Sequence, residues 1–246
     1  MISTTAIDAM LAEEQARFRA ANPGSQALAR RAAEHWHRGV PFHWMLDWGT
    51  PFPLFAERAQ GAELWDVDGH RYDDFCLGDT GSMFGHSPAP VAKAIARQAA
   101  RGLTYMLATE DAPAVADELA RRFGLPFWQV TSTASEANRA VIRWCRGITG
   151  RDKILVFNGC YHGAVDDVFV DLRNGVPELR RSLVGQVYDV RQHTRVIEFN
   201  DLAALEAALA PGDVAAILME PALTNVGMVL PEPGYLEAVR ELTRRH

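Results

Sequence analysis

The feature that most constrains the fold is an alternation of short apolar runs and amphipathic stretches in the second half of the chain. Strands are predicted at 127–131, 154–157, 194–198 and 215–220, and helices at 134–149, 202–209 and 234–244. Strands and helices that alternate in this way form a parallel sheet, because parallel neighbours need crossover connections. The alternation therefore predicts a three-layer α/β fold with a mostly parallel sheet.

The first half of the chain has weaker patterns. Amphipathic helices are predicted at 5–21, 25–37, 88–102 and 111–123. The Asp68-Gly69 pair between two alternating runs predicts a β-hairpin with a two-residue turn. The aromatic, proline-rich stretch 40–55 is predicted to be a loop that covers a core or lines a pocket. The stretch 166–189 has little pattern and is assigned to an irregular segment.

The start of the predicted helix 134–149 is suited to hold an anion. Thr133 and Glu136 have the spacing of a capping box, with Thr133 as the N-cap. A helix entered from a strand end directs unpaired N–H groups and a partial positive charge into the crevice. An ordinary capped helix has the same spacing, and the Glu136 carboxylate repels a phosphate unless the Thr133 N–H occupies its oxygen. A phosphate seat and a plain helix start both stay open at this point.

The turn at 158–163, which reads NGCYHG, adds an aromatic ring and an imidazole to the end of the next strand. Ligands bind beyond the carboxyl ends of the strands in an open parallel sheet. We therefore expect Tyr161 and His162 to lie near the start of helix 134–149. Together the two elements predict one ligand pocket.

The order of these elements resembles the class-III aminotransferases, in the branch near glutamate-1-semialdehyde aminomutase. The resemblance rests on the STASEA helix start, the TGRDKI strand entry, the GCYHG turn and the EPALTNVG segment, and it runs from Phe52 onward. It implies the aspartate aminotransferase-like (fold type I) large domain, with pyridoxal 5'-phosphate as cofactor. It divides the chain into 1–75, a helical segment with the small-domain hairpin, and 76–246, the front part of a C-terminally incomplete large domain.

The resemblance also implies which residues hold the cofactor. They are Thr133, Ala134, Ser135, Tyr161, His162, Glu220 and Asn225. The backbone of Ala134 and Ser135 is expected to hold the phosphate. The Tyr161 ring is expected to stack on the pyridine, and Asn225 to lie near the phenolic oxygen. Ala134 stands where the family has glycine, and its methyl group would crowd the phosphate.

Amino-group transfer needs a lysine that holds the cofactor aldehyde as a Schiff base, and a carboxylate against the pyridine nitrogen. The two lysines of the chain are Lys93, on the polar face of a predicted helix, and Lys153, at the entry end of a strand. Neither is placed near the expected crevice. In the family both catalytic groups come later in the sequence. We therefore expect no catalytic residue among these 246 residues, and the chain alone is predicted to be inactive.

The function implied by the resemblance is that of a pyridoxal-phosphate-dependent transaminase acting on a small-molecule amine or amino acid. The alternatives are a glutamate-1-semialdehyde-type aminomutase, a non-catalytic cofactor-binding module and an unrelated phosphate-binding α/β protein. The stretch 40–55 contains no arginine, which favours an amine or β-amino acid over glutamate semialdehyde. Family members are usually dimers with shared active sites, so a homodimer is implied.

Composition argues against several other classes. The net charge is -6 and the cationic residues are scattered, so no nucleic-acid partner is expected. Apolar runs are far shorter than the ~20 residues of a spanning helix, so we expect no membrane partner and a cytoplasmic location. Cys76, Cys145 and Cys160 lack disulfide or zinc spacing. Buried thiols are expected, and no metal site.

Overall fold

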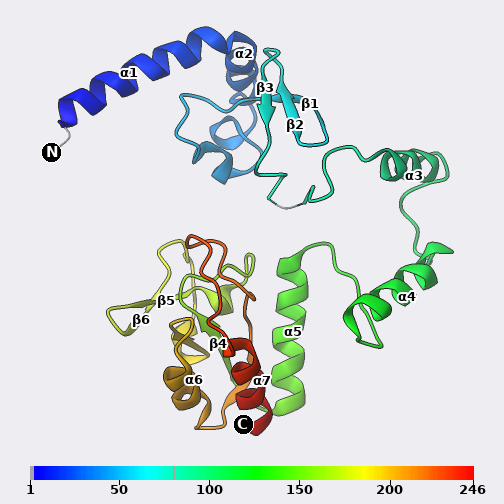
Figure 1. Ribbon diagram of the computed structural model, residues 1–246, viewed down its shortest axis with the longest axis vertical. Helices are drawn as coiled ribbons and strands as arrows, with labels where there is room; N and C mark the ends of the chain where they lie inside the picture. The colour runs from blue at the N-terminus through cyan, green and yellow to red at the C-terminus, as the bar shows by residue number, and fades with distance from the viewer. Residues whose placement is uncertain (1–2, 80) are drawn as a thin grey trace. The chain divides into compact units, whose positions relative to one another are not determined.

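The computed structural model describes residues 3–79 and 81–246 and divides into two compact units (Figure 1). Unit 1 is Met1–Thr109 and unit 2 is Glu110–His246. The division expected after residue 75 concerns domains of the family, and it stays a prediction. None of the helices in the described residues has the length and apolar character needed to cross a bilayer.

Unit 1 combines helices with a small antiparallel sheet. Its helices are α1 Thr4–Ala21, α2 Pro23–Ala32 and α3 Ala89–Ala99, and its strands, in sheet order, are β1 Ala56–Gln60, β2 Glu63–Asp66 and β3 Arg71–Asp73. The helix predicted at 25–37 is too long, because α2 ends at Ala32. A 3₁₀ turn follows at His37–Gly39, where Arg38 and Gly39 have left-handed backbone.

The predicted hairpin is present as β2 and β3, but its connection is longer than the two residues predicted. The Asp66 N–H donates to the His70 carbonyl at 3.1 Å, so three residues lie between the paired positions. The cause is the buried Asp66 carboxylate, which accepts the N–H groups of Asp68 and His70 at 3.0 and 2.9 Å. It also accepts the Tyr72 hydroxyl at 2.7 Å. These bonds fix a wider loop.

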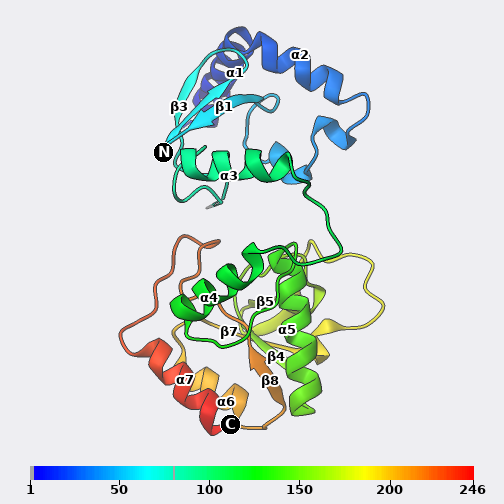
Figure 2. The same cartoon turned by 90° about the vertical axis from the view of Figure 1, so that its right-hand side faces the viewer.

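Unit 2 contains the predicted parallel sheet, and the α/β fold class is confirmed. The strands, in the order β7-β4-β8, are β4 Lys153–Phe157, β7 Thr194–Ile197 and β8 Val214–Ile217, and both pairings are parallel. The helices are α4 Asp111–Phe123, α5 Ala134–Thr149, α6 Leu202–Leu209 and α7 Tyr235–Arg245. Figure 2 shows α5 on one face of this sheet and α6 and α7 on the other.

Strand β4 is the centre of the hydrophobic core. Its residues from Ile154 to Phe157 are buried, as expected for a central parallel strand covered on both faces. The Phe157 ring meets Phe199 and Tyr235 edge-on, with centroid distances of 5.3 and 6.2 Å. This packing holds the carboxyl end of β4, and with it the turn at 158–163.

The strand predicted at 127–131 is wrong. The segment has no strand conformation, and Phe127 and Val130 are 90% and 85% exposed. A short apolar run becomes a strand only where a neighbouring strand supplies hydrogen-bond partners. Within the described residues, the parallel sheet consists of β7, β4 and β8 and pairs with no part of this run.

The irregular segment predicted at 166–189 is also wrong, because it contains a hairpin. Strand β5 Val170–Arg173 pairs antiparallel with β6 Val176–Leu179. Asn174 and Gly175 have φ values of 50° and 77°, the left-handed backbone that a two-residue hairpin turn requires, and Asn-Gly is its strongest sequence signal. Pro177 in β6 obscured that signal, since proline is rare in strands.

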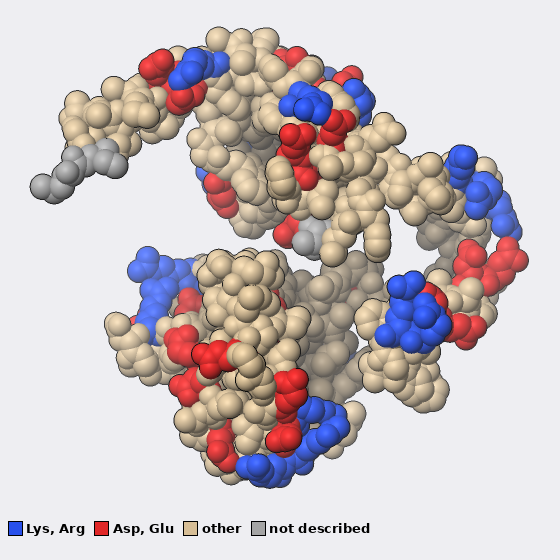
Figure 3. All heavy atoms as spheres, viewed as in Figure 1, with Lys and Arg blue, Asp and Glu red and all other residues tan. Residues whose placement is uncertain are grey.

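Acidic and basic side chains are mixed over the face of the molecule seen in Figure 3. Many are paired, as in the bonds from Arg121 and Arg122 to Glu118 on α4 and from Arg245 to Glu206. Exposed pairs of this kind contribute roughly 0–1 kcal/mol each. These surface ion pairs therefore contribute little to the stability of the fold.

Candidate functional site

Helix α5 begins at the predicted residue with the predicted cap. The Thr133 hydroxyl accepts the Glu136 N–H at 3.2 Å. The Glu136 carboxylate accepts the Ser132 N–H at 2.9 Å, one residue before the expected partner. Ala134 and Ser135 are the first two helical residues, so their N–H groups have no intrahelical acceptor. These two donors are the predicted phosphate seat.

The turn after β4 lies against this helix start. The Ala164 N–H donates to Ser135 Oγ at 2.9 Å, and Asn138 Nδ2 donates to the His162 carbonyl at 2.9 Å. Gly163 permits the approach, because a Cβ there would lie 2.2 Å from Ser135 Oγ. The structure therefore brings together the two elements that the sequence pattern pairs.

Tyr161 and His162 differ in exposure. The Tyr161 side chain is 55% exposed, so its ring can still be covered by a ligand. His162 is buried, and its Nε2 has no hydrogen-bond partner within the described residues. Burial lowers the pKa of His162 below 6.5, and the opposing effect of the Glu220 carboxylate is smaller. The imidazole is therefore neutral at pH 7 and supplies no fixed positive charge.

Glu220 lies beyond the end of β8 at Ile217, and not at the strand end as predicted. Its Oε1 accepts the Tyr161 N–H at 3.0 Å, and its Oε2 accepts the N–H and hydroxyl of Thr224 at 3.1 and 2.9 Å. Burial acts to raise the pKa of Glu220, but these hydrogen bonds outweigh it and the pKa is lowered. The carboxylate is therefore ionised and engaged with the turn that carries Tyr161.

Asn225 is exposed in a loop that is closed by two hydrogen bonds between Leu223 and Val229. The neighbouring Val226 packs on the turn, because a Cβ on Gly159 would lie 2.6 Å from Val226 Cγ1. The loop therefore contacts the turn that carries Tyr161. The role expected for the Asn225 side chain, near the phenolic oxygen of the cofactor, stays a prediction.

Three further residues hold this turn and are absent from the predicted set. Asn138 is one; Arg139 and Arg180 also donate to backbone carbonyls of the turn region, at 3.1 and 3.0 Å. Asn138 could have been found from sequence, since it lies one helical turn after Ser135 on the same face. Arg180 gives no such signal, because it follows the hairpin that lies in the stretch predicted to be irregular.

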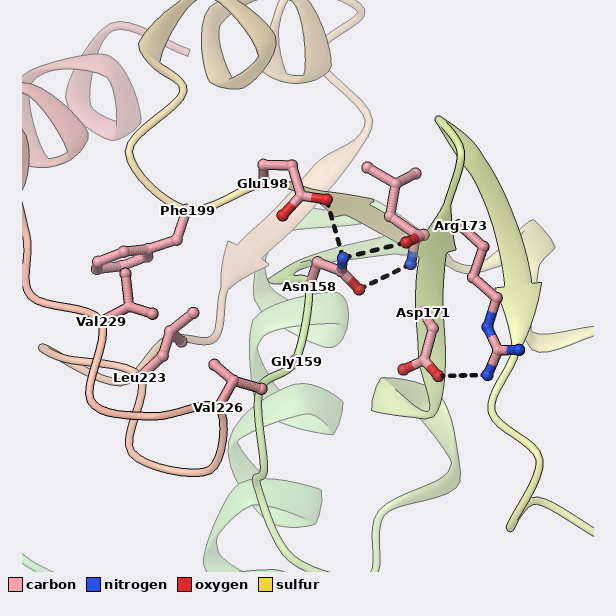
Figure 4. Close-up of a pocket in the computed structure, with 10 residues that line it drawn as sticks. Asn158, Gly159, Asp171, Arg173, Glu198, Phe199, Leu223, Val226 and Val229 are labelled. Atoms are coloured by element: carbon pink, nitrogen blue, oxygen red, sulfur yellow. Dashed lines mark hydrogen bonds and ion pairs between the residues drawn. The ribbon is translucent and has the colours of Figure 1, made fainter. Parts of the chain in front are cut away.

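A pocket of about 460 Å³ opens beyond the carboxyl ends of β4 and β7 (Figure 4). It is lined by Asn158, Gly159, Asp171, Leu172, Arg173, Glu198, Phe199, Leu223, Val226 and Val229. Figure 4 shows apolar side chains on one side and Asp171 and Arg173 on the other. The predicted cofactor residues lie outside this lining, although Tyr161 and His162 belong to the same turn as Asn158 and Gly159. Among the described residues, no group of three His, Cys, Asp or Glu is placed to hold a metal ion.

Comparison with known proteins assigns the chain to a family. The chain matches the family described as Aminotransferase class-III over residues 45–246. It belongs to that family. Glutamate-1-semialdehyde 2,1-aminomutase from Methanothrix thermoacetophila is 38% identical over 202 residues, covering 80% of this chain and 46% of that protein. The enzyme of the same name from Chloroflexus aurantiacus is 39% identical, with 79% and 45% covered. The chain thus spans about half the length of the curated relatives it matches.

Similar solved structures of aminomutases and transaminases confirm the fold type I architecture. A glutamate-1-semialdehyde aminomutase from Pseudomonas aeruginosa PAO1 has a TM-score of 0.95 and 50% identity, covering 100% of this chain and 54% of that chain. An omega-transaminase from Sphaerobacter thermophilus has a TM-score of 0.81 and 29% identity, with 90% and 52% covered. A variant of the P. aeruginosa enzyme is in complex with PMP, and a further similar structure is a transaminase with PLP bound. Pyridoxal phosphate is therefore the cofactor that the family indicates.

Proposed function

We propose that this chain forms the cofactor-seating part of a pyridoxal-phosphate-dependent enzyme that transfers amino groups, with the aminomutase reaction on glutamate 1-semialdehyde as the best-supported activity. The observation that carries the proposal is the contact between the start of α5 and the turn that presents Tyr161. The 2.9 Å bond from the Ala164 N–H to Ser135 Oγ joins them. A helix N-terminus and an aromatic ring on adjoining elements match a ligand that combines a phosphate with a flat ring.

The residues present fit such a ligand. The N–H groups of Ala134 and Ser135 would hold the phosphate, helped by the dipole of the helix that Thr133 caps. The half-exposed Tyr161 ring would cover one face of the pyridine. When bound, the cofactor supplies an electron-accepting ring that stabilises negative charge on a substrate carbon. His162, the buried neighbour of Tyr161 in the turn, is neutral and would add no charge to the site.

Two activities of the family are candidates. Identity to aminomutases is 37–39% among the curated relatives and 50% in a solved structure, compared with 29% for the omega-transaminase. This difference supports an aminomutase, which moves an amino group between two carbons of one molecule. The arginine-free stretch 40–55 supports the second candidate, a transaminase of amines or β-amino acids. A β-phenylalanine aminotransferase from Variovorax paradoxus, with 29% identity and a TM-score of 0.82, is a structural precedent.

The positions of the lysines support the proposal that this chain alone does not turn over. Lys153 Nζ lies 3.1 Å from Asp213 at the amino end of β4, whereas the Tyr161 turn follows the carboxyl end. Lys93 is exposed on α3 in unit 1. Reduction with borohydride in the presence of pyridoxal phosphate should therefore label neither lysine selectively. A homodimer, a small-molecule amine or amino acid substrate and a cytoplasmic location are proposed for the whole enzyme on its resemblance alone.

The cofactor seat is tested by binding. The chain should bind pyridoxal phosphate in equilibrium dialysis, and pyridoxal, which lacks the phosphate, at least about tenfold more weakly, since charge-assisted bonds to the helix start are lost. Gly163→Ala should abolish binding, because its Cβ would overlap Ser135. Gly175→Ala is the matched control: φ is 77° compared with 83°, but no atom lies within 4 Å of the added Cβ. Equal affinity for pyridoxal phosphate and pyridoxal would contradict the proposal that the start of α5 binds the phosphate.

The choice between activities is tested with the same protein. Glutamate 1-semialdehyde, tested with pyridoxamine phosphate, should raise the melting temperature more than β-phenylalanine, tested with pyridoxal phosphate, does, since only a ligand bound by the folded state stabilises it. The reverse order would favour the transaminase.

A further inference from the structure

The peptide group between Cys160 and Tyr161 is bound at both ends by charged side chains. Its carbonyl accepts an N–H from the Arg180 guanidinium at 3.0 Å, and its N–H donates to Glu220 Oε1 at 3.0 Å. Hydrogen bonds with one ionised partner are roughly twice as strong as neutral ones. Rotation of this peptide group would break both bonds at once, so its plane is fixed.

Arg180 is itself held in place by the hairpin. Its Nε donates to Asp171 Oδ1 at 2.9 Å, and its guanidinium carbon lies 5.3 Å from the centre of the Phe169 ring. The side chains of Arg180 and Asp171 are each 20% exposed, so water competes little for this pair. The hairpin therefore aims one guanidinium at one carbonyl.

The same turn is tied to the hairpin a second time, through Asn158. Its Oδ1 accepts the Leu172 N–H at 2.8 Å, and its Nδ2 donates to the Leu172 carbonyl at 3.1 Å. On the other side, two hydrogen bonds from Thr224 fix the Glu220 carboxylate. Arg180 and Glu220, which bind the Cys160–Tyr161 peptide group, are thus both held in place by further hydrogen bonds.

We propose that Arg180 and Glu220 are positioning residues that set the direction of the Tyr161 ring. Because the peptide unit is planar, fixing it leaves rotation about the N–Cα and Cα–C bonds as the main backbone freedom at Tyr161. Glu220, expected from the resemblance to touch the cofactor, acts here through Tyr161. This inference rests on the proposed function, because the direction of the Tyr161 ring matters only if the ring covers a cofactor. The hydrogen bonds of Arg180 and Glu220 to the peptide group are present without a cofactor.

The first experiment therefore uses the chain without cofactor. Exchange of the Tyr161 amide hydrogen, followed by NMR, reports on its bond to Glu220. Glu220→Gln and Arg180→Met should each accelerate this exchange about tenfold, the effect of losing one charge-assisted hydrogen bond. Arg173→Met is the matched control, because Arg173 stands on the same hairpin and faces the same Asp171 at 3.5 Å without reaching the turn. It should change the exchange rate less than twofold.

The second experiment adds pyridoxal phosphate and measures the visible circular dichroism of the bound cofactor together with its dissociation constant. Arg180→Met should weaken binding about tenfold and reduce the dichroic signal per bound cofactor, since a ring of variable orientation imposes less asymmetry. Arg180→Lys keeps the charge but not the two-armed geometry. It should fall between the wild type and Arg180→Met in both measurements.

The outcomes separate this inference from the proposed function. If the wild type binds no pyridoxal phosphate, the proposed function fails for this chain, and amide exchange alone decides the inference. If Tyr161 exchange is unchanged in Arg180→Met, or rises equally in Arg173→Met, the positioning role is overturned. Should Arg180→Met fail to fold, Arg180→Lys compared with Arg173→Lys gives the same decision.

Discussion

Units 1 and 2 have interiors of different chemistry. In unit 2 the buried side chains are apolar residues that surround β4 and extend from Ile142 to Leu242. In the described part of unit 1, Val40 is the only buried apolar side chain, and it is accompanied by buried Asn22, Ser25 and Asp66. Apolar burial stabilises without regard to direction, whereas hydrogen bonds contribute little net free energy but fix geometry. The site of the proposed function is therefore built on the unit with the apolar core.

The polar interior of unit 1 is organised by two carboxylates. Asp66 anchors the loop of the hairpin, and Asp68 accepts the N–H groups of Gly24 and Ser25 at 2.6 and 2.8 Å. These are the first donors of α2, so a side chain more than forty residues away in sequence takes the place of a local helix cap. The buried core of unit 1 thus depends on ionised groups, whereas the buried core of unit 2 depends on apolar packing.

The largest effect is expected from Phe157→Ala, which removes a fully buried ring from the core of unit 2. It should destabilise that unit by about 4 kcal/mol, the usual cost of such a cavity. Hydrogen exchange followed by mass spectrometry in increasing urea reports on each unit separately. Phe127→Ala is the matched control, since that ring is 90% exposed and should cost less than about 0.5 kcal/mol. Equal loss of protection in unit 1 would show that the units do not have separate interiors.

Asp66→Ala should be the most damaging single change in unit 1. It removes the acceptor of four hydrogen bonds at a fully buried site, two of them from His70, and leaves their donors without partners. We expect a loss of about 3 kcal/mol in unit 1, and little change in unit 2. Asp73→Ala, on the same hairpin with a 66% exposed side chain, is the control. If limited proteolysis cleaves unit 1 no faster in Asp66→Ala than in the control, the polar network does not support this unit.

The two units should also respond differently to acid, because unit 1 is held by ionised carboxylates. Burial acts to raise the pKa of Asp66, but hydrogen bonds from Tyr72 and His70 outweigh it, so the pKa lies below the ordinary 3.8. The pKa of Asp74 is also lowered, chiefly by its hydrogen bond from His86. A lowered carboxyl pKa stabilises the fold above the unfolded pKa, and this contribution is lost as pH falls through the folded one.

Unit 1 should therefore lose protection against exchange from about pH 4 downward, before the apolar core of unit 2 does. Exchange rates corrected for the intrinsic effect of pH would measure both transitions in one sample. Coincident transitions would contradict the difference between the interiors.

The parts of the molecule that could be predicted from sequence are those specified by local signals. Helix α5 begins and ends at the predicted residues, because Thr133 and Glu136 mark its start and Gly150, with left-handed backbone, marks its end. Helix α6 likewise matches its predicted bounds, Leu202–Leu209. The apolar run of β4 is long and buried enough that tertiary packing agrees with local preference.

The parts that were missed depend on contacts distant in sequence. The run 127–131 has strand composition but pairs with no strand among residues 3–79 and 81–246. Arg180 acquires its role only because the β5–β6 hairpin carries it to the Cys160 carbonyl. Neither fact is encoded in local periodicity. The convergence of Ser135 with the turn could be anticipated from the general geometry of parallel sheets, and Asn138 from its spacing to Ser135, whereas the contact of Arg139 with the Ala164 carbonyl came from the structure.

The smallest loss of stability is expected from removing the N-cap of α5, which tests a local difference between the two units. In unit 1, none of the N-cap side chains of α1, α2 and α3 accepts a backbone N–H of its helix, whereas the Thr133 hydroxyl accepts one in α5. Thr133→Ala should destabilise unit 2 by about 1 kcal/mol, and Thr133→Ser, which keeps the hydroxyl, should be nearly neutral. The alanine variant should also weaken pyridoxal phosphate binding, because the first turn of α5 presents the N–H groups of the proposed seat. If stability falls and cofactor affinity does not, the phosphate depends on the turn more than on the helix start.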